Sequence, residues 1–342
     1  MQCFASASIF LTRILIISDT HGEVFKVTPE LKADIVIHCG DLTDKFKLHE
    51  YRRTIQLLKD LDAPLKLVIA GNHDFSLDNI SLRRRINEAP EPPEIELIRR
   101  KYENYSKVRQ LFDEAPGITF LNEGTHKFNL HNGAFLTVYT SPCTPSEGGG
   151  NAFQYHPDTG HEFAIGADTD IVTTHGPPLG IMDRTYRGRA GCADLFEGVA
   201  RARPRLHCFG HIHEDWGAKL VAWRWYSTEN PPYVTDIDND RSITIDTLYR
   251  ITPKWSDRPH TRAKKLYQVA QYTQQGYCAT SCCHEDGNAL ELGQHTVFVN
   301  AAVKGVTHSV PINPPRIVDI DLPSSYSIDA GSPENPSPED HT

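Results

Sequence analysis

Short apolar runs recur along the chain, and polar residues follow each of them. Five of these runs lie at residues 13–18, 34–39, 65–70, 170–174 and 206–209. Continuous apolar runs of this length, rich in Val and Ile, predict buried β-strands. Amphipathic stretches separate several of the runs, so the pattern as a whole predicts a layered α/β fold.

The intervening stretches predict helices and further strands. Residues 47–61 carry apolar side chains at helical spacing before Pro64, and residues 94–114 present a second broad apolar face. A shorter helix is expected at 191–201. Strands are also expected at 118–121, 134–140, 219–225, 295–301 and 317–322. We expect the first two of these strands to pair with each other.

Side chains that can bind metal follow the five apolar runs. They occur in Asp19-x-His21, Gly40-Asp41, Gly71-Asn72-His73-Asp74, His175 and Gly210-His211-x-His213. Open α/β sheets bind ligands outside the carboxyl ends of their strands, so these groups should meet at one edge. Asp19 and His21 lie two residues apart, and in extended backbone their side chains would point the same way.

One such group alone is no evidence of a metal site, because an ordinary turn would look the same. Five groups that each follow an apolar run are hard to explain by packing. Buried charges are costly unless they coordinate a metal. The mixture of imidazole, carboxylate and amide oxygen favours Mn, Fe or Zn over Ca or Mg. There are too many ligands for one tetrahedral zinc ion, so two metal ions that share a carboxylate are the economical arrangement.

The five motifs, with His175-Gly176-Pro177-Pro178 completing the fourth, also carry a family resemblance. Over about residues 13–214 the sequence resembles the calcineurin-like metallophosphoesterase superfamily, with every metal-ligand position filled. A closer similarity to the small metallophosphoesterase-domain-containing proteins, some of which resemble class III cyclic nucleotide phosphodiesterases, rests on Thr174–Pro178, Gly210–Gly217 and Val297–Ala302. The resemblance implies a four-layer α-β-β-α sandwich with the site at one edge.

The resemblance also implies a role for each motif residue. It places one metal on Asp19, His21 and His213, and a second on Asn72, His175 and His211, with Asp41 bridging the two. His73 would face the phosphate as a general acid or transition-state stabiliser, and Asp74 would orient its imidazole. The alternatives are an outer-ligand or loop role for His73 and a helix N-cap role for Asp74.

We therefore expect a dinuclear-metal phosphoesterase. A hydroxide bridging two divalent ions, Mn²⁺ first and Fe or Zn as alternatives, would attack a phosphomonoester or phosphodiester, with a cyclic nucleotide among the candidate substrates. Two alternatives stay open: a non-enzymatic metal-binding scaffold or nucleotide sensor, and a protein Ser/Thr phosphatase. Metal content separates the scaffold from the enzyme, and a substrate panel separates the phosphatase.

Composition limits the partners. Lys and Arg number 35 against 44 Asp and Glu, a formal charge of −9, which argues against nucleic-acid binding driven by bulk charge. The apolar run at 9–15 is interrupted by Arg13 and is too short to span a bilayer. The sequence contains no repeated C-x-x-C pairs of the kind that would indicate a structural zinc site. The nearest approach to such a site is the cluster of Cys278, Cys282, Cys283 and His284. We expect a cytoplasmic protein whose oligomeric state the sequence leaves open.

The expected organisation is a short lead-in at 1–12, a metallophosphoesterase domain at 13–322, and a disordered acidic, Pro/Ser-rich tail at 323–342. Residues 226–292 are polar and only weakly periodic, so we expect a partly disordered insertion before the last strands.

Two other features border the motifs. Residues 141–151, with three consecutive Gly, predict a flexible loop that could act as a lid. Arg184, Arg187 and Arg189 follow His175 closely and are candidates for phosphate contact.

Overall fold

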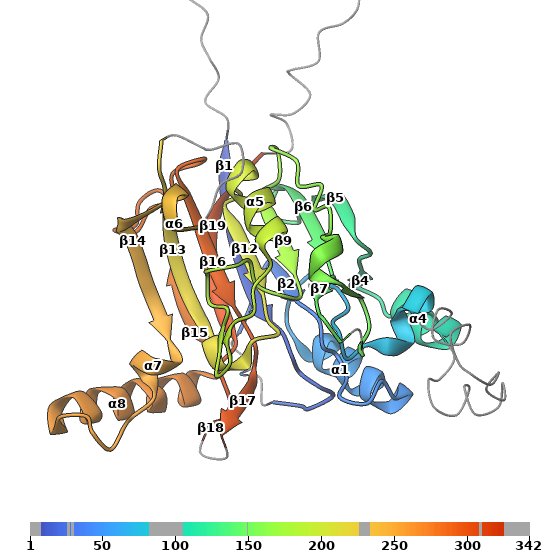
Figure 1. Cartoon of the computed structure of the whole chain (residues 1–342), viewed down its shortest axis with the longest axis horizontal. Helices are drawn as coiled ribbons and strands as arrows, with labels where there is room; N and C mark the ends of the chain where they lie inside the picture. The colour runs from blue at the N-terminus through green and yellow to red at the C-terminus, as the bar shows by residue number, and fades with distance from the viewer. Residues whose placement is uncertain are drawn as a thin grey trace, which may run out of the picture.

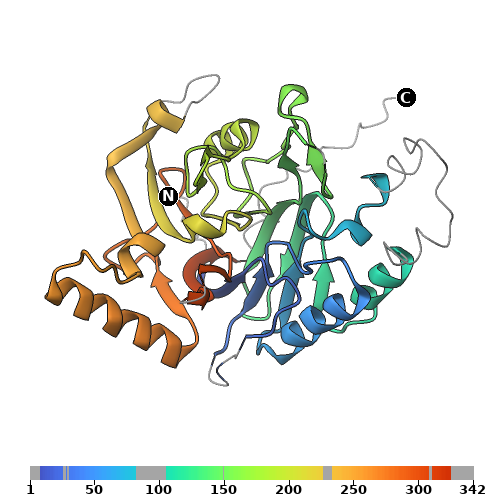
Figure 2. The ribbon, with the colours of Figure 1, turned by 60° about the horizontal axis from the view of Figure 1, so that its bottom comes forward.

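Two large β-sheets form the body of the protein, as Figures 1 and 2 show. The computed structural model describes residues 8–25, 28, 31–81, 105–148, 150–225, 233–307 and 310–324. The first sheet has the strand order β15 (Cys278–Ser281), β19 (Arg316–Pro323), β1 (Ile9–Ile17), β2 (Ile35–His38), β3 (Leu65–Val68) and β4 (Ile118–Phe120). The second has the order β14 (Ile237–Thr247), β13 (Gly217–Trp223), β16 (His295–Asn300), β12 (Leu206–Phe209), β9 (Ile171–Thr174), β6 (Phe135–Ser141) and β5 (Gly124–Asn129).

Parallel pairing brings the ends of the key strands together. In the first sheet β1, β2 and β3 are parallel neighbours, with Ile14 opposite Ile35 and Ile35 opposite Leu65. In the second sheet β9 and β12 are parallel neighbours. Carboxyl ends of parallel strands lie at the same edge of a sheet, so the residues after these strands are neighbours in space.

The two sheets pack face to face through one apolar cluster. It combines buried side chains of the first sheet, such as Ile14 and Ile37, with buried side chains of the second, such as Val138, Ile171 and Cys208. Successive residues of a strand point to opposite faces, so Leu15 and its alternating neighbours must be covered on the other side. Helices provide that cover.

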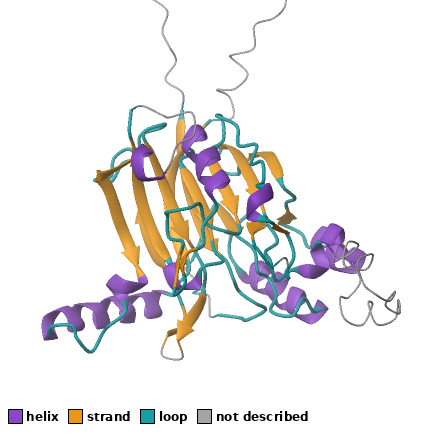
Figure 3. Cartoon of the chain, viewed as in Figure 1, coloured by secondary structure: helices purple, strands orange, loops and turns teal. Residues whose placement is uncertain are grey.

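The outer face of the first sheet is covered by α1 (Leu48–Asp60) and α4 (Tyr105–Asp113). The outer face of the second is covered by α5 (Ala193–Ala202), whose Leu195 and Phe196 pack on Val172 of β9. Figure 3 shows the strands in the centre of the molecule and the helices at its periphery. The predicted α/β class is therefore confirmed.

Most expected elements occur with small shifts in their bounds, but one expected pairing is wrong. The strands expected at 118–121 and 134–140 exist as β4 and β6, yet they belong to different sheets. β4 pairs with β3, and β6 pairs with β5, a strand that the apolar pattern did not reveal. β5 alternates between half-buried and exposed positions, so it carries no continuous apolar run. Of the helix expected at 94–114, residues 94–104 lie outside the described residues.

The described part of the polar stretch at 226–292 contains more regular structure than expected. In its described part, residues 233–292, it forms α6 (Tyr233–Asp236), β14, α7 (Leu248–Ile251), the long helix α8 (Pro259–Gln275) and β15. β14 adds an edge strand to the second sheet and β15 adds one to the first. The stretch thus spans both sheets at one side of the molecule, where Figure 1 shows α7 and α8. The predicted tail lies outside the described residues from 325 onward.

Several short elements complete the chain. They are the strands β7 (Thr144–Pro145), β8 (Gln154–Tyr155), β10 (Arg184–Thr185), β11 (Gly188–Arg189), β17 (Lys304–Thr307) and β18 (Val310–Ile312), and the 3₁₀ turns η1 (Phe75–Leu77), η2 (Pro157–Thr159) and η3 (His213–Asp215). Among the helices that the structure describes, none is long and apolar enough to cross a membrane.

Candidate metal centre

The turns after five strands bring their polar side chains to one place between the sheets. Within the described part of the chain, three sets of potential ligand atoms here each lie within 4.8 Å of one another. The sets are Asp19, His21 and His213; His21, Asp41 and His73; and Asp41, His175 and His211. Sequence reasoning selected all of these residues, and the structure brings them together from both sheets.

In the first set a carboxylate and two imidazoles face one another. His213 Nε2 lies 3.2 Å from Asp19 Oδ1 and 3.4 Å from His21 Nε2. The backbone N–H of His211 donates to both oxygens of the Asp19 carboxylate at 3.1 and 3.0 Å. Asp19 follows β1 and His211 follows β12, so this contact joins the two sheets at the site.

Asp41 lies between the first set and the set that contains His175 and His211. Its Oδ2 is 3.7 Å from His21 Nε2, and its Oδ1 is 3.3 Å from His175 Nε2. Asn72 extends the set that contains His175 and His211, with its Oδ1 2.8 Å from His175 Nε2. On the other side of the ring, His175 Nδ1 donates to the Cys39 carbonyl oxygen at 2.9 Å. That bond leaves Nε2 as the nitrogen directed at Asp41 and Asn72, the orientation that metal-binding histidines adopt.

The backbone is strained where the ligands converge. Asp19, His21, Asp41 and His211 have φ angles of 53°, 49°, 54° and 68°. The left-handed region is uncommon for residues other than Gly, and such strain clusters at functional sites. The expectation that Asp19 and His21 are brought together by extended backbone is therefore wrong. The two residues adopt a tight, strained turn instead.

The electrostatics of the cluster suit cation binding. Burial raises the pKa of Asp41, but His175 and other nearby charges outweigh this effect and lower it to about 2. Burial raises the pKa of Asp19 too, yet the hydrogen bond and charge of His213 help to hold it well below its usual range. Burial lowers the pKa of His21 and of His211 to about 4. The cluster thus combines two carboxylates with two neutral imidazoles.

His175 differs from the other imidazoles. Burial lowers its pKa, but the neighbouring Asp41 outweighs burial, and the pKa rises to about 9. A metal ion binds the neutral imidazole, so a cation at this position has to take the place of the Nε2 proton. The oxygens of Asp41 and Asn72 that face this proton would then face the cation.

The surroundings of His21 give a further reason why these side chains fit divalent metal ions. His21 Nδ1 is buried and has no hydrogen-bond partner among the residues that the structure describes. The nearest carboxylate oxygen, Asp44 Oδ1, lies 3.8 Å away. An imidazole that binds metal through one nitrogen normally donates from the other to a carboxylate or carbonyl oxygen. Asp44 is in position for that role. It stands in the Gly40–Asp44 turn, and its spacing from Asp41 was the signal available in the sequence.

His73 and Asp74 lie at the site but do not form the expected pair. The His73 backbone N–H donates to Asp41 Oδ1 at 2.8 Å, and its Nδ1 donates to the Asp44 carbonyl oxygen at 3.0 Å. The prediction that Asp74 orients the His73 imidazole is therefore corrected, because the Asp44 carbonyl makes that contact. The Asp74 side chain does not cap η1 either.

Asp74 instead joins two ligand-bearing turns. Its carboxylate accepts hydrogen bonds from the backbone N–H groups of Leu42, Thr43 and Gly71 at 3.0, 3.1 and 2.8 Å. The Thr43 hydroxyl donates to the same carboxylate at 3.0 Å. The turn that carries Asp41 is thereby tied to the turn that carries Asn72. Side chains remote in sequence had to be placed before this role could be seen.

Two buried histidines support the turns from within the strands. His38 Nε2 lies 2.9 Å from the Thr20 hydroxyl, next to His21. His207 Nε2 lies 2.9 Å from the Thr174 hydroxyl, next to His175. Burial lowers the pKa of both histidines to about 3, so both imidazoles are neutral at physiological pH. Their positions inside apolar strand runs gave no sign of this supporting role.

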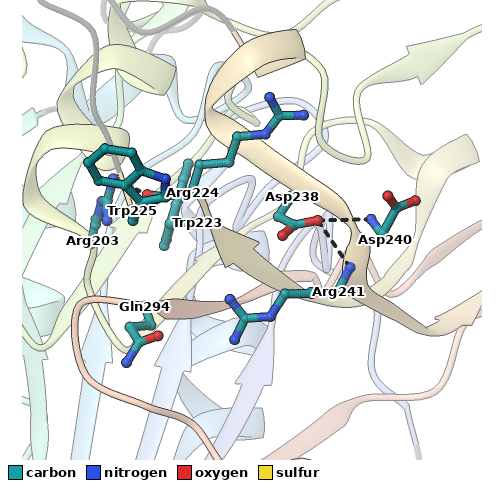
Figure 4. A pocket seen from close by; sticks show the side chains of 8 residues that line it. All are labelled: Arg203, Trp223, Arg224, Trp225, Asp238, Asp240, Arg241 and Gln294. Atoms are coloured by element: carbon teal, nitrogen blue, oxygen red, sulfur yellow. Dashed lines mark hydrogen bonds between the residues drawn. The ribbon is translucent and has the colours of Figure 1, made fainter.

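The structure contains two sizeable cavities, one beside the ligand cluster and one apart from it. One of ≈ 630 Å³ includes Glu214 and Asp215, which follow His213, and is lined by Arg184 and Arg189. Arg187 is not among its lining residues. The other, of ≈ 550 Å³, is lined by residues such as Arg203, Trp223 and Arg241 and includes none of the predicted ligands (Figure 4).

Comparison with known proteins agrees with the geometry. The family model described as calcineurin-like phosphoesterase matches residues 12–215. The human "Metallophosphoesterase domain-containing protein 1" is 30% identical over 253 residues, which are 68% of this chain and 72% of the human protein. The Caenorhabditis elegans "UPF0046 protein T07D4.2" is 31% identical over 60% of this chain and 52% of its own length.

A third relative is much longer than the matched region. "Probable rhamnogalacturonate lyase C" of Emericella nidulans is 34% identical over 217 residues, which are 62% of this chain but 18% of that protein. The region that the family model matches carries all five ligand-bearing turns. The chain therefore belongs to the calcineurin-like phosphoesterase family.

Proposed function

We propose that the chain is a dinuclear-metal phosphoesterase that hydrolyses a phosphomonoester or phosphodiester. The observation that carries this proposal is the position of Asp41, whose two oxygens face His21 on one side and His175 on the other. A carboxylate between two ligand sets can be shared by two neighbouring cations, which is an economical arrangement for a two-metal site. Family membership supports hydrolysis of a phosphoester as the reaction.

The residues divide into two ligand sets around the shared carboxylate. Asp19, His21 and His213 would hold one ion, Asn72, His175 and His211 the other, and Asp41 both. When bound, the ions would supply Lewis-acid chemistry, acidifying water and neutralising charge on the phosphoryl group. Mn²⁺ is our first choice, with Fe and Zn as alternatives, because mixed N and O ligands accept all three.

His73 would act on the leaving group. Its Nδ1 proton is committed to the Asp44 carbonyl oxygen, which leaves Nε2 as the nitrogen available to the substrate. A protonated Nε2 would donate a hydrogen bond to a phosphoryl oxygen or pass its proton to the departing oxygen. Asp44 would thus position both His73, through its carbonyl, and His21, through its carboxylate.

The surroundings favour a small substrate. The cavity beside η3 is lined by Arg184, Arg189 and Lys219, which suits an anionic ester, and Tyr249 adds an aromatic side chain. A cyclic nucleotide combines these two features and belongs in the substrate panel. We place the protein in the cytoplasm, and the seven described cysteines are free thiols, as a reducing compartment requires.

The test is a substrate panel on protein loaded with Mn²⁺, Fe²⁺ or Zn²⁺. It should include bis-p-nitrophenyl phosphate, p-nitrophenyl phosphate, cyclic nucleotides and a phosphopeptide. We expect turnover of at least one ester, two ions per chain, and loss of turnover in Asp41→Asn and His73→Ala. Of these variants only Asp41→Asn should also lose bound metal. Exchange of the exposed Asp168 for Asn is the matched control and should retain activity.

Other outcomes would decide against the proposal. Inactivity with every metal and ester, together with fewer than two bound ions, would favour a metal-binding scaffold. Selective turnover of the phosphopeptide would favour a protein phosphatase. Full turnover by Asp41→Asn would rule out the assigned ligand set.

A further inference from the structure

A separate group of potential metal ligands lies outside the proposed centre. Glu123, Cys143 and His161 each offer one ligand atom, and these atoms lie within 4.8 Å of one another. His161 Nε2 is 2.7 Å from Glu123 Oε1, and Cys143 Sγ is 3.8 Å from Glu123 Oε2. None of these residues belongs to the five ligand-bearing turns.

Three separate segments supply the group. Glu123 immediately precedes β5, and Cys143 follows the end of β6, so antiparallel pairing of β5 with β6 brings them near each other. His161 follows η2 and reaches the pair from a loop. Local sequence spacing therefore gave no sign of the group.

The His161 imidazole is held in place from several sides. Its ring stacks on Tyr155 with centroids 5.2 Å apart and packs edge-on against Phe163 at 4.7 Å. Its backbone N–H donates to Asp194 Oδ2 at 3.0 Å. Preorganised ligands with fixed rotamers are what a metal site needs.

An ordinary ion pair accounts for only part of this arrangement. It explains the contact of His161 with Glu123, but it gives no role to the thiol directed at the same carboxylate. A thiol is a weak hydrogen-bond donor, whereas a thiolate is a strong ligand for zinc and its neighbours. One sulfur, one imidazole nitrogen and one carboxylate oxygen form a ligand set typical of Zn²⁺.

The spacing fits after a small adjustment. Zinc bonds of about 2.0–2.3 Å in tetrahedral geometry separate neighbouring ligand atoms by about 3.3–3.6 Å. The distance between Glu123 and His161 would have to open from 2.7 Å, and that between Glu123 and Cys143 would have to close slightly from 3.8 Å. The side chains of His161 and Glu123 are 24% and 34% exposed, which leaves a path for the ion.

We propose that Glu123, Cys143 and His161 bind one zinc-class transition-metal ion, with water in the fourth position, separately from the phosphoesterase centre. The ion would fasten the loop between Cys143 and His161 to the edge of the second sheet. Part of this loop lies against the proposed centre, because the Ala152 N–H donates to the Asn72 carbonyl oxygen at 3.0 Å. The expected lid segment would then be clamped at its base.

Cobalt substitution tests the site without relying on activity. A thiolate bound to Co²⁺ gives a sulfur-to-cobalt charge-transfer band, and the proposed phosphoesterase centre contains no sulfur ligand. Titration of the full chain with Co²⁺ should therefore produce the band, and its final intensity should correspond to one thiolate-bound ion per chain, whatever the occupancy of the phosphoesterase centre. Cys143→Ser should abolish it, and the half-buried His126→Ala on β5 is the matched control that should retain it.

Zinc affinity and thiol protection give independent measurements. His161→Ala leaves the thiol in place and should weaken zinc binding about tenfold or more, since loss of an outer partner alone costs 10–100-fold. Cys143 is half-buried while the other six described cysteines are buried, so iodoacetamide should label it first among them. Zn²⁺ should slow that labelling in the wild type and have less effect in His161→Ala.

Three results would overturn the proposal. They are the absence of a charge-transfer band in folded wild-type protein, an undiminished band in Cys143→Ser, and labelling of Cys143 that Zn²⁺ does not slow. Circular dichroism of each variant confirms that the fold is retained. Loss of phosphoesterase activity with the band intact would count against the proposed function alone.

Discussion

Two glycines at the proposed centre, Gly71 and Gly210, have no room for a side chain. A Cβ atom on Gly71 would lie 2.3 Å from the Asp41 backbone nitrogen and 2.4 Å from Asp41 Oδ1. A Cβ atom on Gly210 would lie 2.0 Å from Asp19 Oδ2. Both glycines therefore serve close packing of the backbone against a ligand carboxylate, a use that only the smallest residue permits.

Gly71→Ala should displace Asp41 and reduce turnover by about 10²-fold, the effect that a misplacement of about 1 Å can have. The backbone of Gly71 cannot move aside easily, because its N–H donates to Asp74 at 2.8 Å. Metal content and kcat measured on the same preparation test this expectation. Gly287→Ala is the control, since a Cβ there meets nothing within 4 Å. Equal activity of the two variants would contradict the expected crowding.

His207 should make the stability of the protein sensitive to acid. Burial lowers the pKa of this histidine to about 3, below the ordinary value of 6.5. At pH values between these two, His207 binds a proton in the unfolded chain but not in the folded chain. The folded state therefore keeps its full stability above pH 6.5 and loses stability as the pH falls toward 3. The slope for one group is about 1.4 kcal/mol per pH unit.

The variant His207→Phe tests this slope. Phe209 and Phe298 lie around the ring, with centroids 5.1 and 5.5 Å away, so an aromatic replacement suits the surroundings. Urea unfolding between pH 7 and pH 4 should show a smaller loss of stability in the variant than in the wild type. Parallel curves would mean that His207 does not titrate on unfolding.

At the scale of elements, the stretch from β14 to β15 holds the two sheets together at one side. Arg316 of β19 is fully buried and donates to Asp246 Oδ2 of β14 at 3.1 Å. Its guanidinium lies 4.9 Å from the centre of the Trp216 ring. Trp216, Ile251 and Cys278 form a small apolar cluster beneath α7 and α8. A segment with these contacts belongs to the folded body.

Asp246→Ala should lower the free energy of unfolding by about 3–5 kcal/mol, because it leaves the buried Arg316 charge without its partner. Chemical denaturation measures the change. Asp168→Ala is the control, since the Asp168–Lys127 pair is exposed and should contribute about 0–1 kcal/mol. The combined exchange of Asp246→Leu and Arg316→Met should recover part of the loss. A cost near that of the control would mean that the pair does not join the sheets.

At the scale of the whole molecule, metal binding should connect the two sheets. Asp19, Asp41 and Asn72 follow strands of the first sheet, while His175 and His213 follow strands of the second. A ligand that binds only the folded state stabilises it by mass action, by about 2.7 kcal/mol at a concentration of 100 times its Kd. Closure of the sandwich edge is thus linked to metal concentration.

Removal of metal should therefore lower the melting temperature, and added Mn²⁺ should restore it in a concentration-dependent way. In Asp41→Asn the response to Mn²⁺ should be much smaller, because both ligand sets lose their shared carboxylate. Differential scanning calorimetry with and without a chelator measures both effects. An equal response of wild type and variant would place the stabilising ions elsewhere in the molecule.

The sequence alone determined the α/β class, the strands after which the ligands stand, and the chemistry of the ligand set. These follow from local pattern, since a buried parallel strand is an apolar run and its end is marked by polar residues and glycine. Within the groups selected on that basis, the family resemblance assigned metal-ligand roles to Asp19, His21, Asp41, Asn72 and the three later histidines. The structure brings all seven to one place.

The tertiary structure alone decided which strands pair, which hydrogen bonds hold the turns, and which side chains remote in sequence lie together. Periodicity carries no information about partners, so the edge strands β5, β14 and β15 had to be seen in place. The contact with His73 expected of Asp74 is made by the Asp44 carbonyl oxygen instead, because hydrogen bonds depend on where the turns pack. Glu123, Cys143 and His161 converge from segments that only long-range folding brings together, and no local pattern specifies that meeting.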